Sequence, residues 1–369
     1  MATHNNADRI QFLDGLRGAA ILLVIVYHAF ARWTEVVPYG DALAGFPLFV
    51  YGSLGVQLFF MISGFVIFLT LDKCGGVVDF FTRRWLRLFP AMLVCSLFIW
   101  FTAPLVPERP AGPVTAYQLI PGITFIDEVW FRRIGLHTKS IEGAFWSIFV
   151  EVQFYILVGL SYFLVGGRRS AIAVLLIVFS FALLRAPIEN HFVALADTVT
   201  FRRLAFLGDR LRADAYGWFA TGALLYIYRS QKSVGALILG IGVAAFAVAQ
   251  PQLPKSATTL AAALVALLFV VSIASTKLQS ILSQRVLLIL GYISYPLYLL
   301  HENMMVALIV KVGNWVPGLW PILMPVAPVL FVMLVAWIVT AYVEPPLKMF
   351  LQHGLSASRK ALKVFSGTA

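Results

Sequence analysis

The sequence predicts an all-α membrane protein, a bundle of about ten transmembrane helices with both termini in the cytoplasm. Hydrophobic residues make up 60% of the 369 residues and charged residues only 12%, and the mean hydropathy is +0.88. A soluble domain is about 45–50% apolar and about 25% charged. The apolar residues also fall in stretches of about 20, the length that crosses a bilayer. This composition excludes a cytosolic globular enzyme, a disordered chain and a disulfide scaffold.

The predicted spans follow one another along a single domain covering residues 1–369. The first carries Arg17 and His28, so it is not expected to be a cleavable signal peptide. Spans fill residues of about 16–345, and a basic cytoplasmic tail is expected at 346–369. The ten predicted spans are 16–34, 46–71, 86–106, 143–166, 170–187, 213–229, 233–250, 257–275, 286–311 and 321–343.

The distribution of charge predicts the orientation. The formal net charge is +11. If the termini are cytoplasmic, the short inner loops hold the excess of Lys and Arg while the outer loops are nearly balanced, as the positive-inside rule requires. Nucleic-acid binding would need one clustered basic face and is not expected. Cys74 and Cys95 are expected to be free thiols without a redox or metal role.

Two outer connections, 105–142 and 188–212, are too long to be simple turns. Loops of that length usually carry function. Both mix acidic and basic residues, which suits a hydroxylated acceptor better than a lipid tail, although a merely solvated loop explains them equally well.

The first predicted span carries two ionisable residues that apolar surroundings penalise. Arg17 and His28 are eleven residues apart, or three helical turns, so both project from one face about 16 Å apart. Asp14 lies one turn before Arg17 and is expected to pair with it, and Gly15 and Gly18 allow close approach to the backbone. The spacing matches the pantetheine arm of coenzyme A, with His28 as the base that takes a proton from a hydroxyl. A structural Arg and a His bonded to a backbone carbonyl are the alternative.

The third predicted span begins with three arginines, Arg83, Arg84 and Arg87. Guanidinium groups bind phosphate in a bidentate manner, so these residues are candidates to hold the phosphates of coenzyme A. Ordinary positive-inside residues would have the same pattern.

The fourth predicted span carries a polar stripe. Ser147, Glu151 and Tyr155 recur every four residues and share one helix face. A carboxylate in this span needs a cationic or hydrogen-bonding partner, so Glu151 is expected to orient His28 and stabilise its protonated form. A glutamate that only packs helices together is the alternative.

A second stripe occupies the ninth predicted span. Ser294, Tyr298 and His301 recur at three- and four-residue spacing, with Glu302 beside them, and Pro296 should kink the helix. The stripe predicts an acceptor pocket, and Ser147 and Tyr155 would contribute to substrate binding as well. Hydrogen bonding between helices explains the stripe equally well.

Five motifs in order resemble the membrane-bound acyltransferase family 3. They are the Arg and His with ten residues between them in the first span, GVQLFFMISGF, RRWLRLFP, FWSIFVEVQFY and GYISYPLYLLH. The family includes bacterial acetylases of O-antigen, exopolysaccharide and Nod factor. The resemblance implies His28 as the essential catalytic residue, Arg17, Arg84 and Arg87 on the coenzyme A side, and a bacterial inner-membrane location. Glu151, Tyr298 and His301 also fall at positions that the family marks. Some relatives carry a C-terminal esterase-like domain, which is not expected here.

The resulting hypothesis is a membrane O-acyltransferase. It would move an acyl group, foremost acetyl, from cytoplasmic acyl-CoA to a hydroxyl of a carbohydrate or glycolipid acceptor, without a metal. The alternatives are a transporter or channel for an acyl group or small polar solute, and a non-catalytic component of a polysaccharide-export complex. The sequence leaves open the acceptor, the length of the acyl group, a covalent acyl-enzyme, and association with a second copy or with polysaccharide-biosynthesis proteins.

Overall fold

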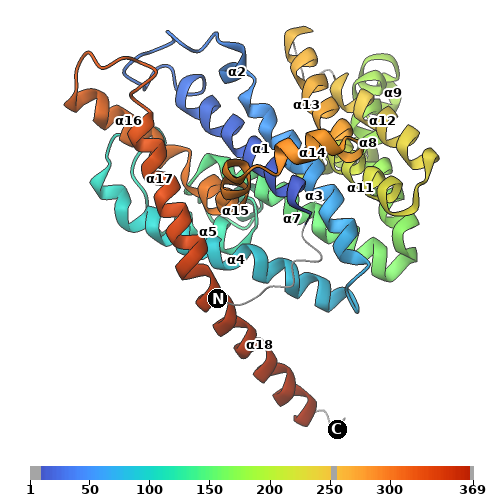
Figure 1. Ribbon diagram of the computed structural model, residues 1–369. Coiled ribbons are helices and arrows are strands. Elements are labelled where there is room, and N and C mark those ends of the chain that lie inside the picture. Colours follow the sequence, from blue (N-terminus) through green and yellow to red (C-terminus); the bar gives the residue numbers. More distant parts are fainter. Residues whose placement is uncertain (1–9, 251–255, 366–369) are drawn as a thin grey trace. The chain divides into compact units, whose positions relative to one another are not determined.

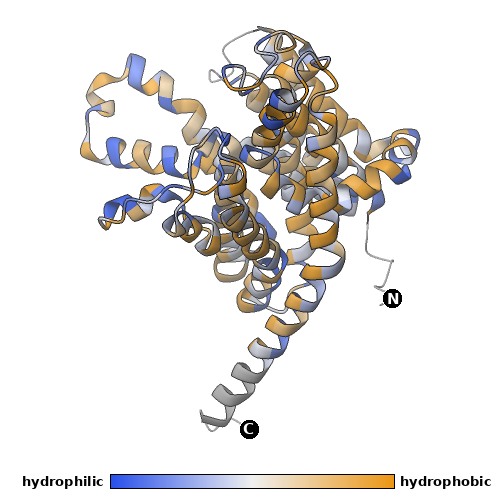
Figure 2. Ribbon diagram, turned by 90° about the vertical axis from the view of Figure 1, so that its left-hand side faces the viewer, coloured by the Kyte–Doolittle hydropathy of each residue, from blue (hydrophilic) through white to orange (hydrophobic). Residues whose placement is uncertain are grey.

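The computed structural model describes residues 10–250 and 256–365, with side chains for all of these except Ser256 and 357–365. Across those ranges every regular element is helical and strands are absent (Figure 1). Within these ranges, six helical stretches are long and apolar enough to cross a membrane, or up to seven if one bent pair forms a single span. Hydrophobic residues cover most of these helices (Figure 2). The predicted all-α, multi-span class is therefore confirmed.

The chain divides into two compact units. The first unit comprises Met1–Tyr27, Phe46–Phe80 and Ser147–Gly291, and the second comprises His28–Gly45, Phe81–Trp146 and Tyr292–Ala369. Residues of both units occur in helices α1 (Gln11–Phe30), α4 (Val77–Thr102), α7 (Trp146–Leu160) and α15 (Arg285–Leu300). The remaining helices of the first unit are α2 (Pro47–Val50), η2 (Gly52–Leu54), α3 (Gly55–Leu71), the π-helix η6 (Ser161–Gly166), α8 (Gly167–His191), α9 (Val193–Ala196), α10 (Val199–Leu211), η7 (Ala213–Ala215), α11 (Tyr216–Gln231), α12 (Val234–Val248), α13 (Ser256–Ala274) and α14 (Thr276–Leu282). Those of the second are η3 (Ala103–Leu105), η4 (Ala116–Gln118), α5 (Leu119–Thr124), α6 (Glu128–Arg133), η5 (Gly143–Phe145), α16 (Asn303–Trp315), α17 (Val326–Ile338), the π-helix η8 (Val339–Val343) and α18 (Glu344–Phe365).

Glycines hold helices of the first unit close together. A Cβ built on Gly64 of α3 would lie 2.1 Å from the carbonyl oxygen of Phe219 on α11, and one on Gly222 of α11 would lie 1.9 Å from that of Met61 on α3. Any larger residue would force the two helices apart. Gly15 is equally tight against Leu282, at 1.7 Å, so the close approach predicted for this glycine of the first span is confirmed.

The chain reverses direction between α7 and α8. Ser170 Oγ donates to the carbonyl oxygen of Ser161 at 2.6 Å, nine residues earlier. Nine residues of straight helix would span about 13 Å, so the hydrogen bond requires a turn, and Gly167 provides it with φ of +65°. The helical stretch Gly143–His191 thus contains both predicted spans 143–166 and 170–187.

Two predicted segments differ from the structure. The expected connection 188–212 is mostly helical, because α8 continues to His191 and α9 and α10 follow. The predicted single span 286–311 is broken: α15 ends at Leu300 and α16 begins at Asn303. Pro296 lies within α15, as expected, but the break comes at His301 and Glu302.

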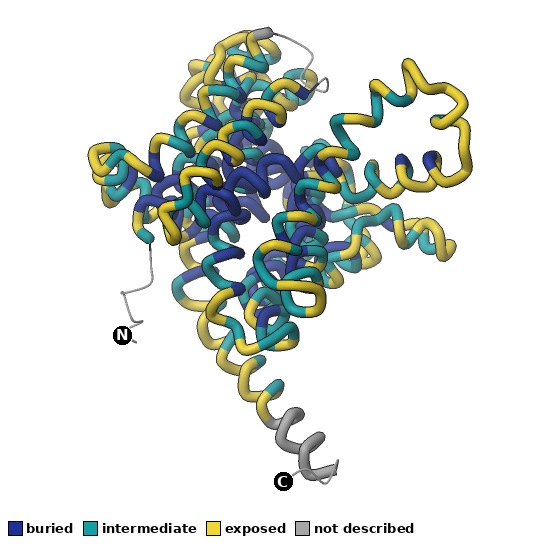
Figure 3. The backbone as a smooth tube through the Cα atoms, turned by 90° about the vertical axis from the view of Figure 1, so that its right-hand side faces the viewer, coloured by how far each residue is buried: buried dark blue, intermediate teal, exposed yellow. Residues whose placement is uncertain are grey.

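The predicted basic tail is helical as far as Phe365. Helix α18 continues directly from η8, and its residues from Glu344 to Ser356 are exposed or half-buried (Figure 3). Residues 366–369 of the predicted tail lie outside the described residues.

Candidate active site

Helix α1 carries both polar residues of the first predicted span. It runs without interruption from Gln11 to Phe30, so Arg17 and His28 are separated by about three turns of one helix. Arg17 Nη1 donates to Asp14 Oδ1 at 2.9 Å, and both side chains are largely buried. The predicted pairing of Arg17 with Asp14 is confirmed.

His28, in the second unit, contacts another histidine. Its Nδ1 lies 3.2 Å from Nε2 of His301, and the two rings meet edge to face with centroids 4.5 Å apart. On the opposite edge of the ring, His28 Nε2 lies 4.0 Å from Oε1 of Glu302. The His28 side chain is 12% exposed. Two consecutive residues, His301 and Glu302, therefore flank both nitrogens of one imidazole.

The break between α15 and α16 places those two residues. The last carbonyls of a helix lack partners within it, and the Tyr298 carbonyl is paired instead with His301 Nδ1 at 2.6 Å. Glu302 then leaves the helical conformation, with φ −79° and ψ −91°, before α16 begins. His301 is completely buried and Glu302 is nearly so.

The short helix η5 holds Glu302 and Tyr298. The backbone N–H of Ala144 donates to Glu302 Oε2, and Tyr298 Oη donates to the carbonyl oxygen of Ala144 at 3.1 Å. A Cβ on Gly143 would lie 2.9 Å from both Glu302 oxygens. Any larger residue at position 143 would therefore require the Glu302 carboxylate to move.

A buried ion pair supports the start of α16. Arg109 Nη1 donates to Glu142 Oε1 at 3.1 Å, and each side chain is 1% exposed. Glu142 Oε2 accepts from the backbone N–H of Asn303 at 2.9 Å and from its side-chain amide at 2.6 Å. The side-chain oxygen of Asn303 accepts in turn from the N–H of Ala111 at 2.9 Å. The connection 105–142, predicted to be a long polar loop, thus anchors the residues beside His28.

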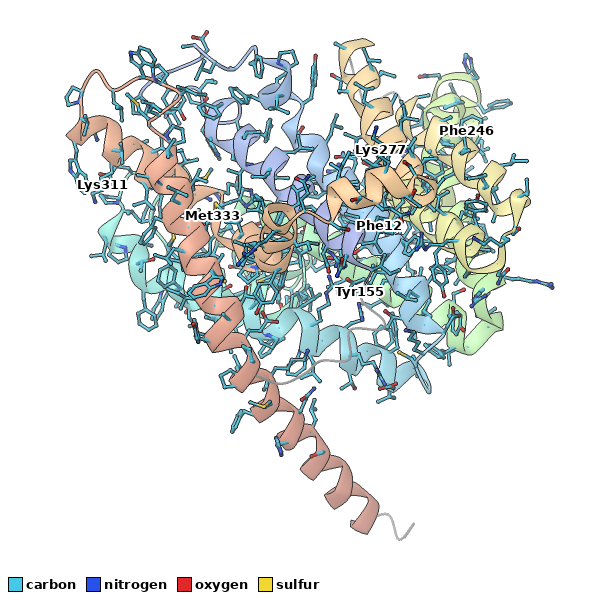
Figure 4. All side chains as sticks on the ribbon, in the orientation of Figure 1. Phe12, Tyr155, Phe246, Lys277, Lys311 and Met333 are labelled. Carbon is cyan, nitrogen blue, oxygen red and sulfur yellow. The ribbon has the colours of Figure 1, made fainter. Side chains whose placement is uncertain are left out.

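The predicted stripe of α7 lies in the first unit, where Tyr155 is labelled in Figure 4. Ser147, Glu151 and Tyr155 all lie on this helix. Glu151 Oε1 accepts hydrogen bonds from Ser63 Oγ and, at 2.5 Å, from Tyr155 Oη. The expected role of Glu151 in orienting His28 stays a prediction, while the carboxylate seen near His28 is that of Glu302.

The three arginines of the third predicted span lie on the first half of α4. Arg83 is exposed, whereas Arg84 and Arg87 are half-buried. On α15, Ser294 is buried one turn before Tyr298, and Tyr295 Oη donates to the Leu88 carbonyl of α4 at 3.1 Å. Binding of phosphate by the arginines and of acceptor by Ser294 stays a prediction.

Sequence reasoning missed the role of Glu302 beside His28, and it missed Arg109 and Asn303 altogether. A carboxylate within an apolar stretch was the available signal for Glu302. Although two histidines and a carboxylate meet here, the described residues contain no group of three or more His, Cys, Asp or Glu side chains that could hold a metal ion.

Comparison with known proteins matches the chain to the family described as Acyltransferase domain, over residues 10–343. O-acetyltransferase OatA of Staphylococcus aureus is 29% identical, over 91% of this chain and 57% of that protein. An O-acetyl transferase of Shigella phage Sf6 is 26% identical, over 48% of this chain and 54% of its own length. The chain thus spans little more than half of these relatives. No solved structure matches it.

The family match covers nearly all of the described chain and confirms the resemblance carried by the five motifs. The chain belongs to the Acyltransferase domain family.

Proposed function

We propose that this protein is a membrane O-acyltransferase that moves an acyl group, foremost acetyl, from acyl-CoA to a hydroxyl of a carbohydrate acceptor. The observation that carries the proposal is the imidazole of His28, held between His301 and Glu302 in the second unit. A positioned, neutral imidazole near a carboxylate is suited to general-base catalysis. The printed names of the two relatives support O-acetyl transfer as the reaction.

In the proposed reaction, the imidazole of His28 removes the proton from the acceptor hydroxyl as its oxygen attacks the thioester carbonyl. The C–S bond of the tetrahedral intermediate then breaks, and the coenzyme A thiolate leaves and takes the proton from His28. The products are the O-acyl ester and coenzyme A, and the imidazole returns to its neutral state. Glu302 would stabilise the protonated imidazole between the two steps.

The donor is proposed to enter from the cytoplasm. Arg83, Arg84 and Arg87 would bind its phosphates, and its pantetheine arm would pass Arg17. The continuous helix α1 supports this proposal, because three turns between Arg17 and His28 match an extended arm of about 16 Å.

The finer topology is also a proposal. The chain would cross a bacterial inner membrane about ten times, with both termini in the cytoplasm. The reversal between α7 and α8 supports two crossings within Gly143–His191. Alkaline phosphatase and green fluorescent protein fusions after Lys232, Gln250 and Ser356 would test it: fluorescence is expected after Lys232 and Ser356, and phosphatase activity after Gln250.

The function is tested with purified protein in nanodiscs given labelled acetyl-CoA and oligosaccharides released from the host cell surface. The wild type should form labelled oligosaccharide, and His28→Gln should not, while both bind coenzyme A equally. His353→Gln is the matched control, because this histidine of α18 is exposed and its Nδ1 lies 2.8 Å from the Met349 carbonyl oxygen of its own helix. Ion or solute flux in liposomes without acyl-CoA, and no transfer, would favour a transporter instead.

A further inference from the structure

The two histidines beside Glu302 are joined through specific ring nitrogens, which fixes where each proton lies. A backbone carbonyl oxygen only accepts hydrogen bonds. His301 Nδ1, 2.6 Å from the carbonyl oxygen of Tyr298, must therefore carry a hydrogen. In a neutral imidazole the other nitrogen then has a lone pair and accepts. His301 Nε2 is accordingly an acceptor, in a side chain that is completely buried.

The same argument determines the protonated nitrogen of His28. Its Nδ1 lies 3.2 Å from the accepting Nε2 of His301, so Nδ1 of His28 must be the donor. The lone pair of neutral His28 is then on Nε2, the nitrogen that lies 4.0 Å from Glu302 Oε1. That distance exceeds a hydrogen bond, but it is short enough for attraction once Nε2 is protonated.

We infer that His301 is a positioning residue: it fixes the tautomer of His28 so that Nε2, facing Glu302, is the proton acceptor in catalysis. This inference rests on the proposed function, and it replaces the expectation that His301 contacts the substrate. The Tyr298 carbonyl, His301 and His28 form one relay in which each hydrogen bond determines the next. Without the accepting nitrogen of His301, His28 could place its hydrogen on Nε2 and donate to Glu302, which would remove the base.

The surroundings of the relay favour this arrangement. The backbone N–H of Ala144 donates to Glu302. The positive charges of Arg32 and Arg109 attract its carboxylate, whereas the negative charge of Glu142 repels it. Tyr298 Oη is directed to the Ala144 carbonyl. Among these groups, His301 is the one that meets His28 Nδ1 at hydrogen-bond distance.

The tautomer is measured directly by two-bond ¹⁵N–¹H spectra of protein labelled with ¹⁵N-histidine. The chain has six histidines, and the signals of His28 are identified by their loss in His28→Gln. In the wild type, His28 is expected to carry its hydrogen on Nδ1. A hydrogen on Nε2 would overturn the inference without any variant being needed.

Two variants separate positioning from folding. His301→Leu removes the acceptor, should move the His28 hydrogen toward Nε2, and should lower acetyl transfer by about 10²-fold or more. His301→Gln retains an acceptor of similar reach and should restore the wild-type tautomer and much of the transfer. An unchanged His28 tautomer in His301→Leu contradicts the inference. So does a His301→Gln variant that unfolds at the wild-type temperature but recovers neither the wild-type tautomer nor acetyl transfer. The spectrum can be recorded without catalysis. If the wild type shows the expected tautomer but transfers no acetyl group, the proposed function is wrong while the assignment of the tautomer stands.

Discussion

Glu142 and Glu302 each precede a helix, and each carboxylate is hydrogen-bonded to the helix that follows the other glutamate. Glu142 precedes η5 and accepts from Asn303, the first residue of α16. Glu302 precedes α16 and accepts from Ala144 of η5. Unpaired N–H groups at a helix start favour a carboxylate. This exchange fixes Glu302 beside His28 and makes the 105–142 connection part of the candidate site.

The Glu142 side of this exchange should determine stability. Glu142→Gln leaves Arg109 as a buried charge without its ion pair, which costs about 3–5 kcal/mol. The unfolding temperature in detergent should fall markedly. Glu189→Gln is the matched control, because Glu189 pairs with Arg185 on an exposed helix face and such pairs contribute about 0–1 kcal/mol. Equal effects of the two variants would show that the buried pair is not structurally important.

The space at Gly143 should determine activity. Gly143→Ala places a Cβ 2.9 Å from both oxygens of Glu302, so the carboxylate must move and acetyl transfer should fall at least tenfold, about 1.4 kcal/mol of barrier. Gly354→Ala on α18 is the control, since a Cβ there meets nothing within 4 Å, and it should transfer at the wild-type rate. Wild-type transfer by Gly143→Ala would mean that the position of Glu302 is unimportant.

Glu302 and Glu151 are competing candidates for the carboxylate that assists His28. Two unit charges 4 Å apart attract each other by about 1 kcal/mol in water and by about 4 kcal/mol near a protein surface. Glu302→Gln should therefore slow transfer by about fivefold to several hundredfold. Glu151→Gln keeps an acceptor for Ser63 and Tyr155 and should slow it less. A larger loss in Glu151→Gln, measured as kcat in the same transfer assay, would return the orienting role to Glu151.

Asp72 should make the stability of the first unit depend on pH. Burial raises the pKa of Asp72, but hydrogen bonds from Arg168 and Tyr226 outweigh it and hold the pKa below its ordinary value. A lowered folded-state pKa means that the stabilisation is present above the unfolded pKa of about 3.9 and is lost as the pH falls through the folded pKa.

Asp72→Asn should therefore lower the unfolding temperature at neutral pH, and the difference from wild type should shrink at acidic pH. Asp41→Asn, at an exposed position, is the control and should match wild type throughout. A difference between Asp72→Asn and wild type that stays constant from neutral to acidic pH would contradict the assignment.

Much of the fold could be predicted because the lipid bilayer imposes local rules. Stretches of about 20 apolar residues identify membrane helices, and the pairing of Asp14 with Arg17 follows from one helical turn. The break after Leu300 could not be predicted in the same way. It depends on Glu142, which lies 161 positions from Asn303 in the sequence and meets the start of α16 only in the folded chain.

The candidate site was predictable in its residue types but not in its pairing. Helical spacing identifies both His28 and His301 as candidates, yet the contact between them joins positions 273 apart. Periodicity places residues on a helix face and does not determine which faces meet. The sequence favours Glu151 as the partner of His28 because this carboxylate lies within an apolar helix, whereas Glu302 lies at a turn, where helical periodicity gives no guidance.

In the proposed reaction, His28 is the general base for acyl transfer from acyl-CoA to a hydroxyl. The most direct test of this role is the transfer of labelled acetyl from acetyl-CoA to host oligosaccharides by the wild type and by His28→Gln in nanodiscs. Labelled ester should form with the wild type, transfer should fall by about 10²–10⁴-fold with His28→Gln, and binding of coenzyme A should be unchanged. Wild-type transfer by His28→Gln would contradict this role.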